Sequence, residues 1–356
     1  MAAVEVGSVF MVETVLVTGG SGFIGGWCVR LLLERGYAVR ATLRANPSDK
    51  GSGEAALRKA VGAEVGEAGG RLTVHLADLT RDAGWAQAAA GCDYVLHVAS
   101  PLGAAAGGGI GENDLVRPAR DGTLRVLRAA VAAGVKRVVM TSAAATARAP
   151  RGSGVVSDET VWADPKDPQF DGYRRSKILA ERAAWDFMAN DRAAAEGRTT
   201  LTTILPVAVF GPVLSPANLG SVSIIQGVLE GRPSRLPRLG FWVVDVRDLA
   251  DLHIRAMTAP QAAGQRFLAA GDFLWMEDIA RALRANLGAR AARTPTRRMP
   301  DFVFRLAALF RPQLRFFTPD LGRRHAMDAG KARRVLDFEP RPGTRTVVDC
   351  AESLPA

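Results

Sequence analysis

The sequence has few of the residues that hold metals or form disulfide frameworks. Its 356 residues include only three cysteines, Cys28, Cys92 and Cys350, which are far apart and odd in number. The four histidines are scattered, and no two lie four residues apart as a ligand pair on a helix would. These spacings offer no disulfide framework and argue against a structural metal site. The cysteine usage favours a reducing compartment, so we expect a cytoplasmic protein.

Long hydrophobic runs are also missing. No uninterrupted apolar segment reaches the roughly 18 residues that a membrane-spanning helix needs. Residues 1–12 carry no positively charged leader and run directly into a strand pattern. We therefore expect them to form a disordered extension rather than a signal peptide. Hydrophobic residues make up 48% of the chain, which suits one large domain or a nucleotide-binding domain with a smaller lobe.

The charge balance is basic, with 46 lysines and arginines against 36 aspartates and glutamates and a net charge of +10. The arginines are spread along helical faces, without a basic patch interleaved with aromatic residues. We therefore expect neither a nucleic-acid partner nor a membrane partner. Part of the positive charge is expected to serve an anionic cofactor.

A glycine-rich turn lies within residues 14–26, which read TVLVTGGSGFIGG. A short apolar strand runs into Gly19, Gly22 and Gly25, and a helical pattern follows over residues 27–35. Gly19 permits the tight turn, Gly22 lets the backbone approach a pyrophosphate, and Gly25 lets the helix pack close to the strand. Free N–H groups and the positive dipole end at the helix start then favour phosphates. This order of strand, turn and helix predicts a dinucleotide-binding site.

The end of the next predicted strand, residues 37–43, indicates which dinucleotide binds. Arg44 stands there, 19 residues beyond Gly25, and Lys50 follows after a short loop. An acidic residue at this place hydrogen-bonds the ribose 2′-hydroxyl of NAD, whereas a basic one accommodates the 2′-phosphate of NADP. An arginine fork suits phosphate because it binds two oxygens at once. A solvated arginine at a strand end would look the same, but the pattern favours NADP(H).

Strand and helix patterns alternate over the first two-thirds of the chain, which predicts an α/β Rossmann fold with a doubly wound parallel sheet. We expect the NADP-binding domain to span residues 13–212. A smaller substrate-binding lobe is expected over residues 213–356, with some segments returning to the first domain. His97 lies within a near-continuous apolar strand and is interpreted as a packed core residue. The expected strands are 15–18, 37–43, 72–76, 94–99, 135–141, 200–209 and 241–246, and the expected helices are 27–35, 115–133, 173–187, 221–230, 246–257, 276–287 and, on the lobe surface or as a lid, 301–310.

Tyr173 and Lys177 are four residues apart at the start of a predicted helix and therefore share one face. Reduction of a ketone needs a proton donor for the oxygen that becomes an alkoxide as hydride arrives. A tyrosine phenol has an ordinary pKa of about 10, which is poorly matched to neutral pH. A lysine ammonium beside it, together with the positive nicotinamide of the oxidised cofactor, would lower that pKa, and the same lysine can hold the nicotinamide ribose. In a chain with this glycine turn, the pair predicts a reductase.

These motifs together resemble those of the extended short-chain dehydrogenases/reductases. The similarity is to the branch that contains dihydroflavonol reductase, cinnamoyl-CoA reductase and the fungal carbonyl (methylglyoxal) reductases, and it runs from about residue 14 to the C-terminus. It rests on TGGSGFIG at 18–25, VRATLR at 39–44, ADL at 77–79, HVASP at 97–101, VKRVVMTS at 135–142, YRRSK at 173–177 and LPVAVFGP at 205–212.

The resemblance implies cofactor contacts at several strand ends. Arg44 would meet the adenosine 2′-phosphate and Asp78 the adenine. Residues 98–100 would line the cofactor, and two residues of the 205–212 motif would lie against the nicotinamide. The expected cofactor-binding residues are Gly19, Ser21, Gly22, Phe23, Ile24, Gly25, Arg44, Lys50, Asp78, Leu79, Val98, Ala99, Ser100, Tyr173, Lys177, Pro206 and Val209.

One position departs from the family pattern. The family usually has Thr-Ser-Ser where this chain has Thr141, Ser142 and Ala143, and the second serine helps the tyrosine hold the substrate oxygen. Ser142 comes one residue earlier, and on an extended segment one residue reverses the face of the side chain. Either the strand end bends so that Ser142 serves as the third catalytic residue, or Thr146 or a water replaces the serine, or the activity is weak. Losing such a donor can cost on the order of 10²–10³ in rate.

The sequence as a whole predicts a cytoplasmic NADPH-dependent carbonyl reductase that acts on a small-molecule ketone or aldehyde, as a monomer or a homodimer. Tyr173 would donate the proton, Lys177 would tune it and Ser142 would orient the carbonyl. A 3β-hydroxysteroid dehydrogenase or a sugar-nucleotide epimerase of the same superfamily is an alternative, although Arg44 argues against the NAD that an epimerase favours. A non-catalytic NADP-sensing or scaffold protein is another, supported only by the missing second serine.

Overall fold

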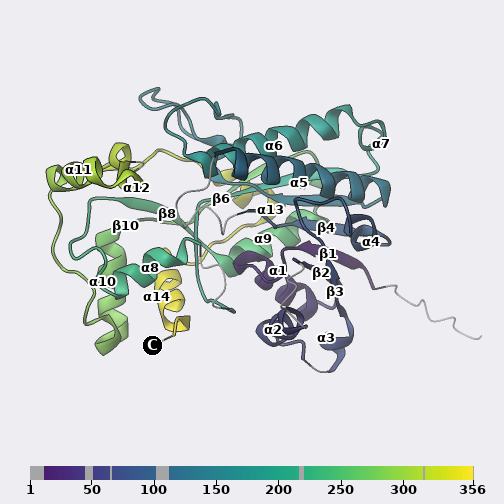
Figure 1. Cartoon of the computed structure of the whole chain (residues 1–356), viewed down its shortest axis with the longest axis horizontal. Coiled ribbons are helices and arrows are strands. Elements are labelled where there is room, and N and C mark those ends of the chain that lie inside the picture. Colours follow the sequence, from purple (N-terminus) through teal and green to yellow (C-terminus); the bar gives the residue numbers. More distant parts are fainter. Residues whose placement is uncertain are drawn as a thin grey trace, which may run out of the picture.

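The computed structural model describes residues 12–44, 51–64, 66–101, 112–215, 220–315 and 317–355. Lys50 and residues 1–11 of the expected extension lie outside the described residues. The strands form two sheets, one of seven strands and one of three (Figure 1). The large sheet carries the glycine turn and the predicted catalytic pair at its edge, so its topology positions the candidate site.

The large sheet is parallel throughout, with the strand order β3-β2-β1-β4-β5-β6-β9. The chain starts in the middle at β1, winds outward through β2 and β3, and then returns to the other side of β1 with β4. This reversal confirms the predicted doubly wound α/β fold. The strands are β1 (Thr14–Thr18), β2 (Ala38–Leu43), β3 (Leu72–Leu76), β4 (Tyr94–His97), β5 (Arg137–Thr141), β6 (Thr200–Pro206) and β9 (Arg266–Ala269).

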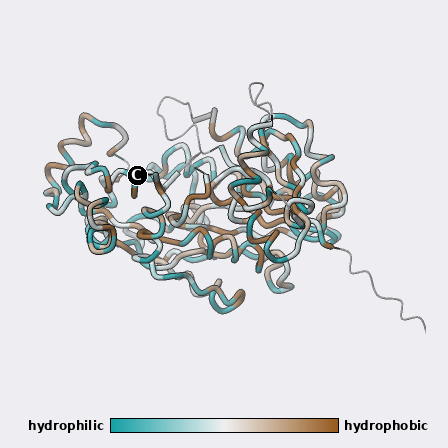
Figure 2. Tube along the Cα trace, turned by 90° about the horizontal axis from the view of Figure 1, so that it is seen from below, coloured by the Kyte–Doolittle hydropathy of each residue, from teal (hydrophilic) through white to brown (hydrophobic). Residues whose placement is uncertain are grey.

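Helices cover both faces of the large sheet, and the hydrophobic stretches run along its strands in the interior (Figures 1 and 2). In β1, Val15 and Val17 belong to one core and Leu16 to the other, as alternation along a strand requires. The first core includes α1 (Phe23–Glu34), α2 (Ser52–Val61), α9 (Val246–Thr258) and α13 (Gly330–Leu336), and the second includes α4 (Trp85–Ala89), α5 (Glu112–Ala132) and α6 (Gly172–Asn190). Two short helices, α3 (Gly66–Gly70) and α7 (Arg192–Ala195), complete this part.

The smaller sheet has the order β10-β8-β7 and shares a separate core with helices from the C-terminal third. Strands β7 and β8 are parallel, whereas β10 is antiparallel to β8. The outer face of one of these helices, α11, leaves Phe302, Leu306, Leu309 and Phe310 exposed, so this helix lies at the surface. The elements are β7 (Ala208–Phe210), β8 (Gly240–Asp245), β10 (Phe273–Trp275), α8 (Val222–Leu229), α10 (Met276–Leu287), α11 (Asp301–Phe310), α12 (Pro312–Arg315) and α14 (Gly343–Ser353).

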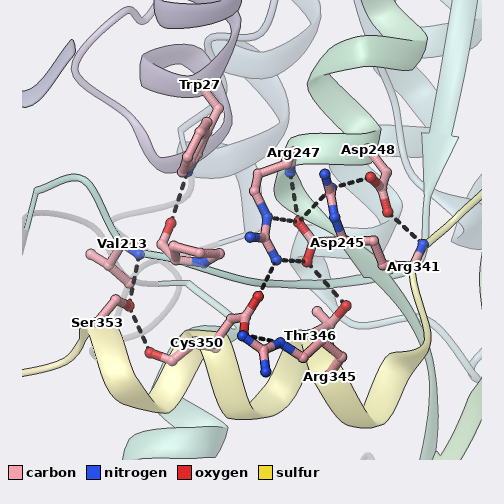
Figure 3. A network of polar contacts seen from close by, with 12 residues as sticks. Trp27, Val213, Asp245, Arg247, Asp248, Arg341, Arg345, Thr346, Cys350 and Ser353 are labelled. Carbon is pink, nitrogen blue, oxygen red and sulfur yellow. Dashed lines mark hydrogen bonds and ion pairs between the residues drawn. The ribbon is translucent and has the colours of Figure 1, made fainter. Parts of the chain in front are cut away.

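A network of polar contacts joins the two parts (Figure 3). Asp245 is fully buried at the end of β8 and caps α9, because its carboxylate accepts the backbone N–H of Arg247 at 2.9 Å. The Arg247 guanidinium bridges Asp245 at 2.7 Å and Asp349 of α14 at 2.6 Å. On α1, the indole N–H of Trp27 donates to Pro212 O at 2.8 Å. These contacts hold β8 and α14 of the smaller part against helices of the larger one.

Three features of the fold differ from the sequence expectation. The strand expected at residues 200–209 is split at Val207, because Pro206 has no N–H to continue the ladder and the chain crosses to the smaller sheet as β7. Strand β9 was not predicted, since its four residues begin with a buried arginine, Arg266, that interrupts the apolar pattern. Helix α1 begins at Phe23, four residues before the expected start.

Candidate active site

The predicted site residues gather at the carboxyl ends of the parallel strands. β1 ends at Thr18 before the glycine turn, β4 ends at His97 before residues 98–100, and β5 ends at Thr141 before Ser142. β1 pairs directly with β4, although two strands separate them in the sequence. This is the switch point of the sheet, where doubly wound folds bind their ligands.

Steric requirements explain the three glycines of the turn. Gly19 has a φ of 70°, and a Cβ at this position would lie 3.0 Å from Ala99 Cα. A Cβ on Gly22 would lie 3.2 Å from Gly19 O, and a Cβ on Gly25 would collide with the same carbonyl. Side chains would therefore separate the turn from β4 and from the first turn of α1. The close approach expected from the sequence is present on both sides.

The N-terminus of α1 is open to an anion. Gly22 occupies the N-cap position, so no side chain caps the helix, and its first turn contains no acidic residue. Ser21 is exposed just before the cap, and Phe23 and Ile24 contribute the first helical N–H groups. Unsatisfied N–H groups and the helix dipole at this end suit the diphosphate of a dinucleotide. The residues present therefore fit the group that the sequence predicts.

His97 is a core residue that fixes the backbone after β4. Its Nδ1 lies 2.9 Å from Thr18 Oγ1, and its Nε2 lies 3.2 Å from Thr123 Oγ1. Thr18 Oγ1 accepts the N–H groups of Val98 and Ala99, both at 3.0 Å, so the Thr18 hydroxyl donates to Nδ1 and His97 carries its proton on Nε2. Burial lowers the pKa of His97 to about 3, so the ring is neutral. The predicted core role is confirmed.

Arg44 and Asp78 follow the ends of the neighbouring strands β2 and β3. The Asp78 carboxylate accepts hydrogen bonds from N and Oγ1 of Thr80, both at 2.7 Å, and these bonds lower its pKa. The positive charge of Arg44 lowers the pKa of Asp78 further. Both bonds use Oδ1, so among the described residues Oδ2 is left for a ligand donor, and Arg44 is exposed beside it. This placement suits the predicted contacts with adenine and the 2′-phosphate.

The remaining predicted cofactor residues lie on strands or in the loops that follow them. Leu79 packs against α5 at Gly122, where a Cβ would come within 2.6 Å of Leu79 Cβ. Ser100 follows β4 and is partly exposed. Pro206 ends β6 at the same edge of the sheet, whereas Val209 lies on β7 and belongs to the core. The contact of Pro206 and Val209 with the nicotinamide stays a prediction.

Tyr173 lies in the first turn of α6, where Asp171 is the N-cap. The Asp171 carboxylate accepts the N–H of Arg174 at 2.7 Å and fixes the start of the helix. Tyr173 is partly exposed, yet enough protein surrounds it that burial raises its pKa to about 12, with the Asp171 charge raising it further and Arg174 opposing. The sequence predicts instead that Lys177 and a bound cofactor lower this pKa. In the protein alone burial and the Asp171 charge outweigh the charge of Arg174, and the phenol is protonated at neutral pH.

Lys177 follows one turn later on the same face of α6 and is 4% exposed. Its ammonium donates to Thr141 O at 3.1 Å, which ties α6 to the carboxyl end of β5. Burial lowers the pKa of Lys177 to about 8, and the negative charge of Glu181 opposes that shift. Lys177 therefore remains mainly protonated at neutral pH and places a positive charge at the end of β5.

The two side chains considered as replacements for the missing serine are both engaged elsewhere. Ser142 is 2% exposed, and its hydroxyl donates to Glu181 Oε2 at 2.6 Å. Thr146 is buried, donates to Ala143 O at 2.9 Å and accepts from Arg266 at 3.1 Å. The backbone at Ala143 is extended (φ −156°, ψ 149°), so the side chains of Ser142 and Ala143 point to opposite faces. This geometry argues against the predicted role of Ser142 and leaves a water molecule or weak activity as the remaining alternatives.

Sequence reasoning missed a buried ion pair one helical turn beyond Lys177. Glu181 Oε1 accepts Arg266 Nε at 2.9 Å and Thr203 Oγ1 at 2.8 Å, and the two charged side chains are 0% and 7% exposed. The Arg266 guanidinium also lies over the ring of Trp162, 3.7 Å from its centroid. The position of Glu181 four residues after Lys177 was an available signal. Its partner could not be found in this way, because β9 was not predicted.

Comparisons with known proteins agree with this geometry. The model of the NAD dependent epimerase/dehydratase family matches residues 15–271. The chain belongs to this family. Within it, cinnamoyl-CoA reductase 1 of Petunia hybrida is 38% identical over 272 residues, which cover 75% of each chain. An anthocyanidin reductase of Vitis vinifera is 34% identical over 277 residues, which cover 73% of this chain and 77% of the relative.

Two solved reductase structures share the fold over nearly the whole chain. Gre2 from Candida albicans, solved in complex with NADPH, has a TM-score of 0.75 and 25% identity, and the match covers 96% of this chain and 98% of that one. The yeast methylglyoxal/isovaleraldehyde reductase Gre2, also solved with NADPH, has a TM-score of 0.76 and 24% identity over the same shares. The predicted similarity to extended short-chain dehydrogenases/reductases of these branches is confirmed.

Within the described part of the chain, no group of three or more histidine, cysteine, aspartate or glutamate residues is placed to hold a metal ion. The three cysteines are buried and free. Among the described helices, none combines the length and the hydropathy that would let it cross a bilayer.

Proposed function

We propose that this member of the epimerase/dehydratase family is an NADPH-dependent reductase of a ketone or an aldehyde. The proposal is carried by the catalytic pair on α6. Tyr173 and Lys177 share one face of the helix, and the 3.1 Å bond from Lys177 to Thr141 O holds that face at the end of β5. The glycine turn opens at the same edge of the sheet. The chain is an NADP-dependent oxidoreductase acting on carbonyl and alcohol groups, as its reductase relatives support.

NADPH supplies the hydride when it is bound. The glycine turn and the N-terminus of α1 would hold its diphosphate, and the exposed Arg44 would hold its 2′-phosphate. Tyr173 is protonated at neutral pH and would donate its proton to the carbonyl oxygen as negative charge develops there. Lys177 would hold the nicotinamide ribose and stabilise the developing charge with its ammonium.

A second donor to the carbonyl oxygen would have to come from solvent. The Ser142 hydroxyl donates its hydrogen bond to Glu181, and the Thr146 hydroxyl donates its hydrogen bond to Ala143 O. The methyl group of Ala143 cannot donate. We therefore assign the second hydrogen bond to a water molecule beside Ala143, which would be a looser support than a fixed hydroxyl.

The substrate is proposed as a small aldehyde or ketone selected by the smaller lobe and by the connection between η2 (Ala144–Ala147) and α6. The relatives are named for different substrates, which fits a shared cofactor site with a variable substrate site. The proposed division places cofactor binding in residues 13–212 and substrate binding mainly in residues 213–356. The free, buried cysteines are compatible with the reducing cytoplasm that we propose as its location.

The decisive experiment measures NADPH consumption with a panel of aryl ketones, α-keto esters and aldehydes. We expect turnover with NADPH, much slower turnover with NADH, and a loss of at least about 10²-fold in Tyr173→Phe. Tyr37→Phe is the matched control, because Tyr37 precedes β2 at the opposite edge of the sheet. Tight NADPH binding without turnover on any substrate would instead favour the non-catalytic sensing protein. A preference for NAD would favour an epimerase or a steroid dehydrogenase.

A further inference from the structure

A cavity of about 310 Å³ lies where two distant segments of the chain meet. One segment, residues 148–157, follows η2, and the other, residues 323–326, precedes α13. The lining contains no acidic residue. It does contain four arginines, Arg148, Arg151, Arg323 and Arg324, which together with His325 define what we call the arginine cavity.

Backbone pairing holds the two segments together. Ser157 N donates to Ala326 O at 3.1 Å, and Asp328 N donates to Ser157 O at 2.9 Å. The Ser157 hydroxyl accepts the N–H of Ala149 at 3.0 Å, which closes the first segment onto itself. Hydrogen bonds of the backbone and of the Ser157 hydroxyl therefore hold the walls of the arginine cavity in place.

The positive charge of the arginine cavity is only partly balanced. Asp320 lies behind the lining, where its carboxylate accepts Arg148 at 2.7 Å and sits 3.6 Å from Arg151. Among the described residues, Arg323 has no carboxylate within ion-pair distance, and Arg324 lies over the ring of Trp242, 4.8 Å from its centroid. Asp320, together with Asp167, whose charge also acts on Arg151, therefore offsets only part of the charge of the four arginines.

Two further observations indicate that the arginine cavity favours an anion. The Nε of Arg148 is buried without a hydrogen-bond partner among the described residues, and an unsatisfied buried donor of this kind is costly. Burial lowers the pKa of Arg151. The negative charges of Asp320 and Asp167 oppose this shift, whereas the positive charges of Arg148 and Arg323 add to it. The guanidinium groups are therefore close enough to repel one another, and an oxyanion between them would relieve that repulsion.

The arginine cavity lies close to the proposed reaction site along the chain. Arg148 follows Ala143 by five residues, and the 3₁₀ turn η2 fills the interval. At about 2 Å of rise per residue, the two positions are about 10 Å apart. Tyr173 does not line the arginine cavity, so an anion bound there would leave the proton donor free.

We propose that the arginine cavity binds the carboxylate or phosphate group of an anionic carbonyl substrate. This inference rests on the proposed reductase function. The anionic group would anchor the substrate to Arg151 and Arg323, and its carbonyl end would extend past η2 toward Tyr173.

The test compares 4-(4-formylphenoxy)butanoate with its methyl ester, two aldehydes of matched length that differ in charge. Wild-type enzyme is expected to favour the carboxylate by about tenfold in kcat/KM, mainly through KM, since a charge-assisted hydrogen bond carries that much discrimination. In Arg151→Gln and in Arg323→Gln the preference is expected to approach unity. Arg192→Gln is the control, because that side chain is 95% exposed on α7, and it should keep the wild-type preference. Equal rates for the two aldehydes in wild type, or a preference that persists in the double variant, would overturn the proposal.

A second measurement tests anion binding to the arginine cavity without relying on turnover. Inorganic pyrophosphate is titrated calorimetrically into protein saturated with NADPH, so that the cofactor's phosphate sites are filled. Binding that is lost in the Arg151→Gln, Arg323→Gln double variant supports an anion site, and absence of binding in wild type contradicts it. If such binding occurs while acid and ester are reduced equally, the arginine cavity serves a separate anion and the substrate proposal is overturned. If neither aldehyde is reduced, the proposed reductase function is what fails, and calorimetry still decides the anion site.

Discussion

The Ser142 hydroxyl donates a hydrogen bond of 2.6 Å to Glu181, while the next side chain, Ala143, points to the other face of the extended backbone. One residue of register therefore separates a buried structural serine from the place where a substrate oxygen would meet a donor. Substitutions at these two positions are expected to have opposite consequences.

Ala143→Ser is expected to raise kcat by at least about tenfold, because it adds a fixed donor where only water is available and such donors contribute on the order of 10²–10³ in rate. The measurement is steady-state NADPH oxidation with a saturating aldehyde. An unchanged or lower kcat would show that the Ala143 side chain does not face the carbonyl oxygen.

Ser142→Ala is expected to change kcat by less than about threefold and to lower the free energy of unfolding by about 1–2 kcal/mol, since Glu181 loses one donor but keeps Arg266 and Thr203. Urea unfolding and turnover are measured on the same preparation. A loss of about 10²-fold in kcat without loss of stability would restore Ser142 as a catalytic residue.

Arg266→Met is expected to lower the free energy of unfolding by about 3–5 kcal/mol, because it leaves the fully buried carboxylate of Glu181 without its charged partner. Adding Glu181→Gln should recover part of that loss. The control is Arg30→Met, which breaks an exposed pair with Glu34 and should cost about 0–1 kcal/mol. Equal effects of the two single substitutions in urea unfolding would contradict this account of the buried pair.

Acidification from pH 7 to pH 5 is expected to destabilise the protein through His97 and His253. Burial lowers their pKa values to about 3 and about 4, whereas in the unfolded chain each titrates at about 6.5. Below pH 6.5 the unfolded state therefore binds more protons than the folded state, and the free energy of unfolding decreases as the pH is lowered. By pH 5 the expected loss is about 2 kcal/mol per histidine, at about 1.4 kcal/mol for each pKa unit.

Urea unfolding at a series of pH values checks this slope. Carboxylates whose pKa values are lowered in the fold, such as Asp78 and Asp251, lose their contribution only near and below about pH 4, so they do not account for a change above pH 5. Constant stability between pH 7 and pH 5 would mean that these histidines are not held neutral.

Arg44→Glu is expected to reduce the ratio of kcat/KM for NADPH to that for NADH by at least about tenfold, because a carboxylate would repel the 2′-phosphate that we propose the guanidinium binds. Arg30→Glu is the control, since that exposed arginine lies farther along α1. A ratio that is unchanged in Arg44→Glu would place the selection of the cofactor elsewhere.

Local sequence patterns were enough to predict the fold and to place the candidate site at one edge of the sheet. The glycines at 19, 22 and 25, the apolar strands and the Tyr173–Lys177 spacing are local patterns, and their physical requirements are met within a few residues of chain. The alternation of strands and helices then restricts the topology, since parallel strands need crossover connections. That is why the large sheet and its carboxyl edge could be predicted.

Which side chains at that edge are available for chemistry depends on contacts between residues far apart in the sequence. Glu181 bonds Ser142 across 39 residues and Arg266 across 85, and these contacts remove Ser142 from the reaction site. The raised pKa of Tyr173 and the arginine cavity likewise depend on segments brought together by folding. Burial and hydrogen-bond partners arise from residues distant in the chain, so no local pattern encodes them.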